Sequence, residues 1–322
     1  MERTLGALGV LAGVVLLGGD VVHADAAGPT DYRSEVVAVV PETPAVAVSI
    51  VGGDAFVELE VAPGTEVLVV GYQNEPFLHI RPDGVVEENE RSPSVYVSRT
   101  RMGGADVPDY ADAALPPAWK AVATGGRYAW HDHRAHWMSP DAPTTAVPGD
   151  KVQTGVIPLI VAGVAVSVTV DTYWLPAPSR VPLYAGAVGG VMLVVGALVG
   201  RRALAWPLLV AALAAAGVGW WQFSSLPAET DPRLVWWLLP AVAAASASAA
   251  VVLGRRLVAY ALVILGGLEL AAWVFVRRAG AWRALIPTDA PLVLDRAVLV
   301  GVAVVALAAM AGGIIALYRI TD

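Results

Sequence analysis

Hydrophobic and polar residues follow two different patterns in the two halves of this chain. In the first half, residues 33–176 hold short Val-rich runs, and in one of them Val57, Leu59 and Val61 alternate with Glu58 and Glu60. Side chains on a strand point to opposite faces in turn, so this alternation predicts a strand with one buried and one solvent-facing side. The runs expected to form strands are residues 34–40, 45–51, 55–61, 66–72, 77–80, 94–99, 152–161 and 164–174, with two more within 120–137. Gly- and Pro-containing turns separate them, and such a series of short strands predicts an all-β sandwich of the immunoglobulin-like or cupredoxin-like class.

The second half consists mainly of five long apolar runs. They cover residues 182–200, 203–223, 234–254, 257–276 and 297–318. Each is close to the ~20 residues that an α-helix needs to cross a bilayer, and in lipid the backbone must satisfy its own hydrogen bonds. We therefore expect a β-sandwich domain in residues 27–178 and an α-helical transmembrane bundle of five helices in residues 179–322. The lipid bilayer is then a partner of the second half.

The N-terminus has the pattern of a secretory signal peptide. Glu2 and Arg3 precede an apolar run at residues 5–19, and small residues follow at 22–26. The apolar run is short for a bilayer span, and small residues at this spacing are what a signal peptidase reads. We expect residues 1–26 to be a signal peptide; an uncleaved anchor helix is the alternative.

Basic residues between the helices predict the orientation in the membrane. Arginine pairs at residues 201–202 and 255–256 join neighbouring helices, and the positive-inside rule places both turns in the cytoplasm. The sandwich is then extracytoplasmic on a multi-pass plasma-membrane protein, and the C-terminus is cytoplasmic. Arg277, Arg278 and Arg283 depart from the rule, because they fall on the outer side.

The composition agrees with a membrane protein and excludes several classes of function. The mean hydropathy is +0.62 and 57% of the residues are hydrophobic, which is too apolar for an ordinary soluble domain of this length. Residues 27–181 carry a net charge of −9, against +4 for residues 182–322, and the acidic half would repel nucleic acid. The chain has no cysteine, which excludes disulfides, thiolate nucleophiles and cysteine-based zinc sites.

One segment carries the side chains for specific chemistry. Residues 130–138, Trp-His-Asp-His-Arg-Ala-His-Trp-Met, hold three of the chain's five histidines. If this nonapeptide is extended, His131 and His133 project from one face and form a chelate for a borderline metal ion. His136 joins them if the strand bulges, and the Met138 thioether favours copper. His79 is a further candidate ligand from a neighbouring strand.

The same segment also allows interpretations without a metal. Asp132 and Arg134 are candidates for orienting the imidazole rings, but an ordinary salt bridge between them is the simpler interpretation. In that case the histidines hydrogen-bond across the sheet, or the segment forms a partner-binding edge. An open three-histidine site activates water or oxygen in some enzymes. No pattern here indicates a substrate, so an enzyme is not the favoured class and no catalytic residue is assigned.

Glu269 is the one acidic residue well inside an expected membrane span. A carboxyl group at that depth is costly, which makes a proton or cation path the functional hypothesis. A hydrogen bond between packed helices is the structural alternative.

Four segments together resemble an uncharacterised family of actinobacterial membrane proteins. They are Gly-Tyr at 71–72, Glu-Pro-Phe-Leu at 75–78, Ser-Pro-Ser-Val-Tyr at 92–96 and the nonapeptide at 130–138. The resemblance covers the extracytoplasmic domain and implies no established activity. A looser similarity is to copper-resistance proteins that join a copper-binding β-sandwich to membrane helices. This chain departs from that pattern because its helices lack histidine and methionine pairs.

The sequence leaves two main classes of function. The first is a cell-surface membrane protein whose β-sandwich binds a transition metal, copper over zinc, in metal handling. The second is a non-catalytic envelope scaffold or assembly protein, in which the histidine motif is structural and the partner is another envelope protein. A transporter that uses Glu269 is a third hypothesis.

Overall fold

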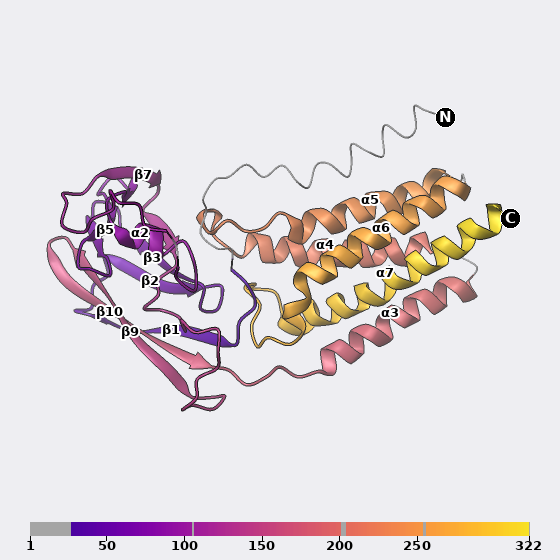
Figure 1. Ribbon diagram of the computed structural model, residues 1–322, viewed down its shortest axis with the longest axis horizontal. Coiled ribbons are helices and arrows are strands. Elements are labelled where there is room, and N and C mark those ends of the chain that lie inside the picture. The colour runs from indigo at the N-terminus through magenta and orange to yellow at the C-terminus, as the bar shows by residue number, and fades with distance from the viewer. Residues whose placement is uncertain (1–26, 105, 201–203, 254–255, 322) are drawn as a thin grey trace.

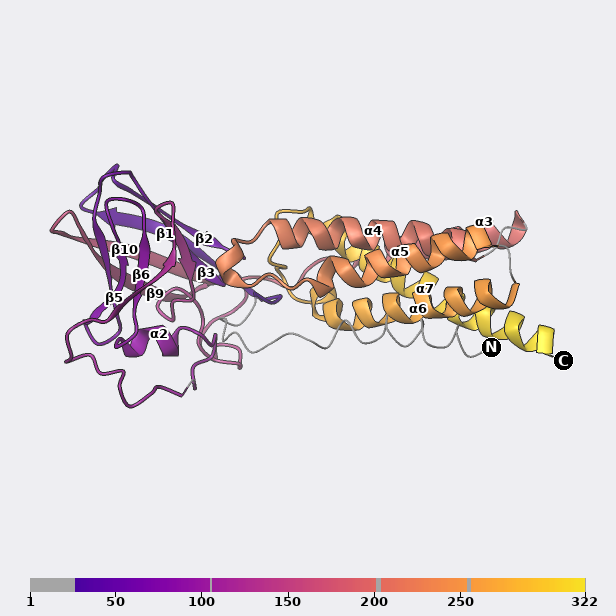
Figure 2. The ribbon, with the colours of Figure 1, turned by 90° about the horizontal axis from the view of Figure 1, so that it is seen from above.

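The computed structural model describes residues 27–104, 106–200, 204–253 and 256–321. It consists of a β domain followed by a bundle of long helices. The domain and the bundle lie one after the other along the long axis of the molecule (Figures 1 and 2). The signal peptide predicted at residues 1–26 and the basic residues at 201–202 and 255 lie outside the described residues.

Among the described residues of the first half of the chain, ten strands form two sheets. The larger sheet has the order β1-β10-β9-β4-β5-β6-β7 and the smaller has the order β2-β3-β8. The larger sheet contains β1 (Tyr32–Val40), β4 (Val67–Val70), β5 (Pro76–Ile80), β6 (Val86–Asn89), β7 (Trp119–Ala123), β9 (Lys151–Val161) and β10 (Val164–Trp174). The smaller sheet contains β2 (Val46–Val51), β3 (Phe56–Val61) and β8 (Arg127–Trp130). Neighbouring strands are antiparallel throughout both sheets, which confirms the predicted all-β domain.

The hydrophobic core lies between the two sheets. Val57 and Leu59 of β3 face Leu78 of β5 and Leu159 of β9 in one cluster, and each is no more than 2% exposed. Glu58 and Glu60 occupy the alternate positions of β3 and stay outside this cluster. The period-two pattern of the sequence therefore places the core correctly.

Two segments of the β domain differ from the sequence prediction. Residues 94–99, expected as a strand, belong instead to the short helix α2 (Pro93–Val97) and the turn after it. The Ser92 side chain accepts a hydrogen bond from the Ser94 amide, and Pro93 occupies the first helical position, which are helix-start signals that outweigh the β-prone Val and Tyr. The second difference is β6, an acidic strand that the sequence does not signal because its partners β5 and β7 provide the pairing.

Five helices follow, and all five are long and apolar enough to cross a membrane, which confirms the predicted bundle. They are α3 (Val181–Val199), α4 (Ala205–Ser224), α5 (Val235–Leu253), α6 (Arg256–Arg277) and α7 (Leu292–Thr321). Glycines allow close backbone contact between some of them. A Cβ on Gly186 of α3 would lie 2.1 Å from the Ala297 carbonyl oxygen of α7, and one on Gly219 of α4 would lie 1.8 Å from the Trp236 carbonyl oxygen of α5. Small residues let membrane helices approach in this way.

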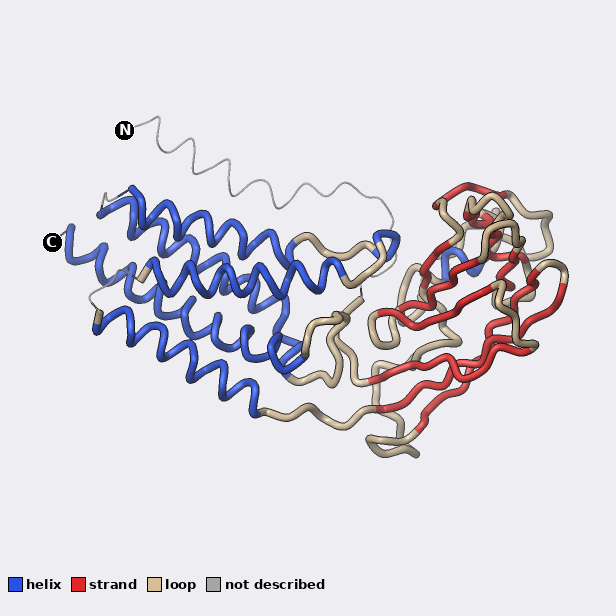
Figure 3. Tube along the Cα trace, turned by 180° about the vertical axis from the view of Figure 1, so that it is seen from behind, coloured by secondary structure: helices blue, strands red, loops and turns tan. Residues whose placement is uncertain are grey.

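The sandwich lies at one end of the bundle (Figure 3), and side chains of the two halves pack together there. Phe56 and Ala129 of the small sheet share an apolar cluster with Leu226 and Trp236 of the helical half. The loop between α6 and α7 pairs with the chain just before β1, where Thr30 and Leu285 form a two-way backbone bridge. Apolar packing and backbone hydrogen bonds therefore both join the two halves.

The arginines that depart from the positive-inside pattern have local partners in the structure. Arg277 pairs with Asp295, and Arg283 pairs with Asp31 of the β domain. Arg278 donates a hydrogen bond to the Phe275 carbonyl oxygen at 2.6 Å. Arg277 and Arg283 therefore each have an acidic partner.

Candidate functional site

The nonapeptide at residues 130–138 is a turn and not a continuation of a strand. Strand β8 ends at Trp130, and the Ala135 amide donates to the Asp132 carbonyl oxygen at 2.9 Å, which closes a turn over residues 132–135. The expectation that His131 and His133 project from one face of an extended strand is therefore wrong. Arg134 is the physical reason, because its side chain folds back onto Asp132 within the turn.

The turn nevertheless gathers the three imidazoles, with His136 in the middle. The His136 ring centroid lies 6.2 Å from that of His131 and 5.5 Å from that of His133. His131 is 1% exposed and His136 is fully buried, whereas His133 is partly exposed. The cluster thus lies at the end of β8 with one ring open to the surface.

In each of the three rings, one nitrogen forms a hydrogen bond with a backbone carbonyl oxygen. His131 Nδ1 donates to Ala55, His133 Nε2 donates to Thr100 at 2.8 Å, and His136 Nδ1 donates to Trp137 at 3.2 Å. A carbonyl oxygen only accepts, so each of these nitrogens carries the hydrogen and the other nitrogen of a neutral ring presents a lone pair. Metal-binding histidines are commonly held by this kind of carbonyl contact.

His136 is the most unusual member of the cluster. Its Nε2 atom is buried and has no hydrogen-bond partner among the residues that the structure describes. Burial lowers the pKa of His136 to about 3, and the nearby positive charge of Arg101 adds to this effect. The ring is therefore neutral at physiological pH, with its lone pair available and unpaired.

Met138 lies in the same neighbourhood as His133, where both side chains approach Gly103 of the loop that follows α2. A Cβ placed on Gly103 would lie 3.9 Å from both the His133 ring and the Met138 methyl group. No group of three histidine, aspartate or glutamate side chains close enough to hold a metal ion occurs among the described residues. The donors that the structure offers are therefore imidazole nitrogens together with a thioether.

Asp132 and Arg134 stabilise the turn rather than the imidazole rings. Both Asp132 carboxylate oxygens accept from the Arg134 guanidinium at 2.8 Å, and one also accepts from the Trp130 indole at 3.0 Å. Arg134 further donates to the Val70 carbonyl oxygen and lies over the Tyr72 ring. None of these interactions involves an imidazole ring, so they give no support to the prediction that Asp132 and Arg134 orient the rings directly. The pair instead positions the histidines by holding the backbone of the turn.

Three segments far apart in the sequence meet around this turn. The Tyr72 hydroxyl accepts the His133 amide hydrogen at 3.0 Å, and the two rings stack. The Tyr72 amide in turn donates to Ser94, whose hydroxyl donates to the buried Glu75 at 2.6 Å. The motif residues at 71–78 and 92–96 thus form the hydrogen-bonded support of the histidine turn.

His79 lies apart from this cluster. Its two ring nitrogens contact the carboxylates of Glu66 at 2.9 Å and Glu87 at 3.0 Å, and its ring packs on Trp119. Both ring nitrogens are thus occupied by carboxylate partners, which a metal ion would have to displace. The prediction of His79 as an additional ligand has no support in this geometry.

Glu269 lies in α6 beside the Ser246 hydroxyl of α5. One of its carboxyl oxygens is buried without a hydrogen-bond partner, and no ion pair to it occurs within the described part of the chain. The contact with Ser246 agrees with the helix-packing alternative.

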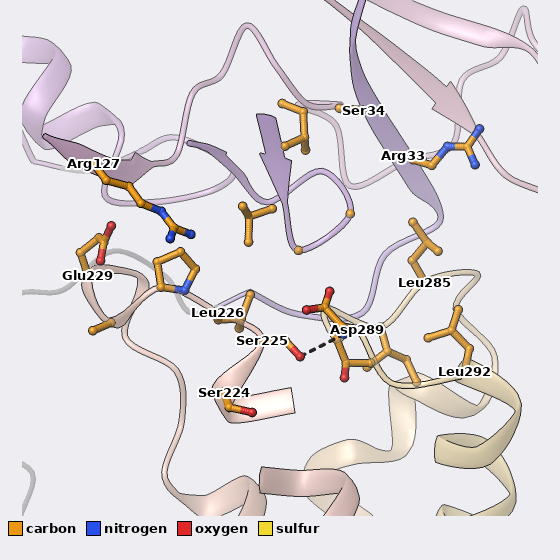
Figure 4. Close-up of a pocket in the computed structure, with 18 of the residues that line it drawn as sticks. Arg33, Ser34, Arg127, Ser224, Ser225, Leu226, Glu229, Leu285, Asp289 and Leu292 are labelled. Carbon is orange, nitrogen blue, oxygen red and sulfur yellow. Dashed lines mark hydrogen bonds between the residues drawn. The ribbon is translucent and has the colours of Figure 1, made fainter. Parts of the chain in front are cut away.

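A cleft of about 840 Å³ lies between the small sheet and the end of the bundle (Figure 4). Arg127 of β8, Glu229 after α4 and Asp289 before α7 line it, and the Asp289 amide donates to Ser225 at 3.0 Å. Glu229 also accepts the Ala129 amide hydrogen at the free edge of β8. No sequence signal predicts this cleft, because its walls come from both halves of the chain.

Comparison with protein-family models, with curated proteins and with solved structures gives no match for this chain. Its function therefore has to follow from the chemistry of its own residues.

Proposed function

We propose that this chain is a multi-pass plasma-membrane protein whose extracytoplasmic β-sandwich binds a copper ion through the histidine turn. His133 and His136 are the primary ligands, Met138 supplies a thioether, and His131 borders the site. The observation that carries the proposal is the buried, unpaired Nε2 of the neutral His136 ring, 5.5 Å from the His133 ring between centroids.

The chemistry of this nitrogen supports a metal ligand. A buried polar atom without a partner costs about 1–3 kcal/mol, so native structures seldom retain one without a role. An imidazole that stays neutral across the physiological range can bind a metal ion without first losing a proton. The backbone carbonyl on the opposite nitrogen keeps the lone pair on the free one.

Copper is favoured over zinc by the donor set. Structural zinc sites take four ligands in a tetrahedral arrangement, and the described residues contain no group of three histidine, aspartate or glutamate side chains that could supply most of them. Imidazole together with a thioether is typical of sites that select Cu(I). A site of two imidazoles and one thioether therefore suits monovalent copper in metal handling at the cell surface.

A Cu(I) titration of the full-length protein in detergent tests this proposal. With a chromogenic Cu(I) chelator as competitor, the wild type is expected to bind one equivalent, and His136→Gln and His133→Gln are each expected to bind at least ~10-fold more weakly. His79→Gln is the matched control, because it removes an imidazole outside the cluster and should bind like the wild type. Equal copper binding by all four proteins, or none by the wild type, overturns the proposal.

The second candidate function is an envelope scaffold, and the contacts of Asp132 and Arg134 favour it. A turn held by a buried ion pair and two further hydrogen bonds forms a rigid surface without any metal. In that case His133→Gln lowers the thermal stability to the same extent with and without copper. A copper site instead predicts that added Cu(I) stabilises the wild type alone, because only the folded state binds the ion.

A further inference from the structure

Three charged residues are buried together where the bundle meets the sandwich. Arg277 at the end of α6 is 6% exposed, and Asp295 and Arg296 at the start of α7 are 1% and 5% exposed. Arg277 pairs with Asp295 and also donates to the side-chain oxygen of Gln222 on α4. These residues lie far along the chain from the histidine turn, so a site built on them is independent of the proposed copper site.

The charges of this cluster do not balance. Two guanidinium groups are always protonated, whereas one carboxylate is present to neutralise them. Arg296 forms no ion pair within the described residues and donates instead to the carbonyl oxygens of Gly280, Arg283 and Ala284. One positive charge is therefore left over in a buried environment, where an uncompensated ion is unfavourable.

A cavity adjoins the cluster on the side of Arg277. It measures about 80 Å³ and is lined in part by Arg277, Gln222, Asp295, Trp236 and Arg233. Within the described part of the chain, the buried Nε of Arg277 has no hydrogen-bond partner. Arg233 at the rim is exposed and forms no ion pair among the described residues. A water molecule needs ~10–15 Å³ on this measure, so the cavity has room for a group of several heavy atoms.

We propose that this cavity binds a singly charged phosphate group between Arg277 and Arg233. A guanidinium group donates well to phosphate oxygens, and a monoanion supplies the one negative charge that the buried cluster lacks. Asp295 also lines the cavity, and its charge disfavours a dianion. The group is either the phosphodiester of a membrane lipid, since the cavity lies at the end of apolar helices where headgroups are found, or free inorganic phosphate.

Two measurements on the full-length protein in detergent separate these sources. Native mass spectrometry after exposure to phosphatidylglycerol vesicles reports a retained lipid, and melting curves in increasing inorganic phosphate report the free anion. Arg233→Gln is expected to weaken the binding by about tenfold or more, because it removes one charged donor. Arg277→Lys keeps the charge but lacks the Nε donor, and the same weakening is expected. Arg278→Gln is the matched control, since this neighbouring exposed arginine does not line the cavity.

Each outcome decides the proposal. A retained lipid that is lost in Arg233→Gln assigns the phosphodiester of a lipid, and a saturable rise in melting temperature with phosphate assigns the free anion. If Arg277→Lys does not fold, Arg233→Gln alone decides. Absence of both effects in the wild type, or equal effects in Arg233→Gln and Arg278→Gln, overturns the proposal.

Discussion

Protonation of His136 should destabilise the sandwich as the pH falls. The ring is fully buried and its pKa is lowered to about 3, mainly by burial, from 6.5 in an unfolded chain. Between these two values the unfolded state binds one proton more than the folded state. The free energy of unfolding therefore decreases as the pH falls through 6.5, and His136 contributes almost no pH dependence more than about one pH unit above that value.

The size of the effect follows from the two pKa values. Each unit of difference corresponds to ~1.4 kcal/mol, so the contribution of His136 at pH 5.0 is a loss of about 2 kcal/mol relative to pH 7.5. Carboxylates of the sandwich also titrate in this range. Comparison with His136→Asn cancels them, because the variant keeps every carboxylate and lacks the imidazole.

Hydrogen exchange of the amides in β8 and β10 measures the effect in the full-length protein. Exchange rates at pH 7.5 and 5.0, in detergent with a metal chelator and corrected for intrinsic exchange, give the free energy of opening of the sandwich. The wild type is expected to lose about 2 kcal/mol more than His136→Asn. The same pH dependence in both proteins would show that His136 is not a buried neutral ring, and the reasoning fails.

Three further changes test other parts of the structure. Asp132→Asn leaves the largely buried guanidinium of Arg134 without its carboxylate partner. Chemical denaturation should show that the free energy of unfolding falls by about 3–5 kcal/mol, and a decrease below ~1 kcal/mol contradicts the buried ion pair. Gly219→Ala places a Cβ against a carbonyl of α5, whereas Gly217→Ala in the same helix meets open space, so only the first should lower the melting temperature, by the equivalent of roughly 1–3 kcal/mol. Glu229→Ala frees the Ala129 amide at the edge of β8, and its hydrogen exchange should become roughly 10- to 100-fold faster; an unchanged rate argues against this contact.

The histidine turn shows where prediction from the sequence ends. The spacing of His131 and His133 predicts a chelate only if the backbone is extended, and the sequence alone does not show that Arg134 folds back onto Asp132 to form a turn instead. The turn depends on Val70 of β4 and Gln153 of β9, which bind Arg134 through its guanidinium and its carbonyl oxygen. His136, predicted as the third ligand, is therefore the ring that lies between the other two.

The helices and the two-sheet domain follow from patterns within short windows of the chain. An apolar run of about 20 residues has few alternatives to a membrane helix, and alternation of Val and Leu with Glu selects the buried face of β3. Such local periodicity can be predicted from the sequence alone, because the secondary structure of each residue depends mainly on its near neighbours in the chain.

The candidate sites depend instead on contacts between distant segments. The carbonyl groups that anchor the imidazoles come from residues 55, 100 and 137, and the buried charges beside the cavity come from α6 and α7, with Gln222 of α4 beside them. Burial, pairing and the unpaired nitrogens of His136 and Arg277 arise only when these segments pack. The sequence therefore determines which side chains are available for binding, because it fixes the residue types. The packing of distant segments decides which of their atoms are buried without a partner and so can bind a ligand.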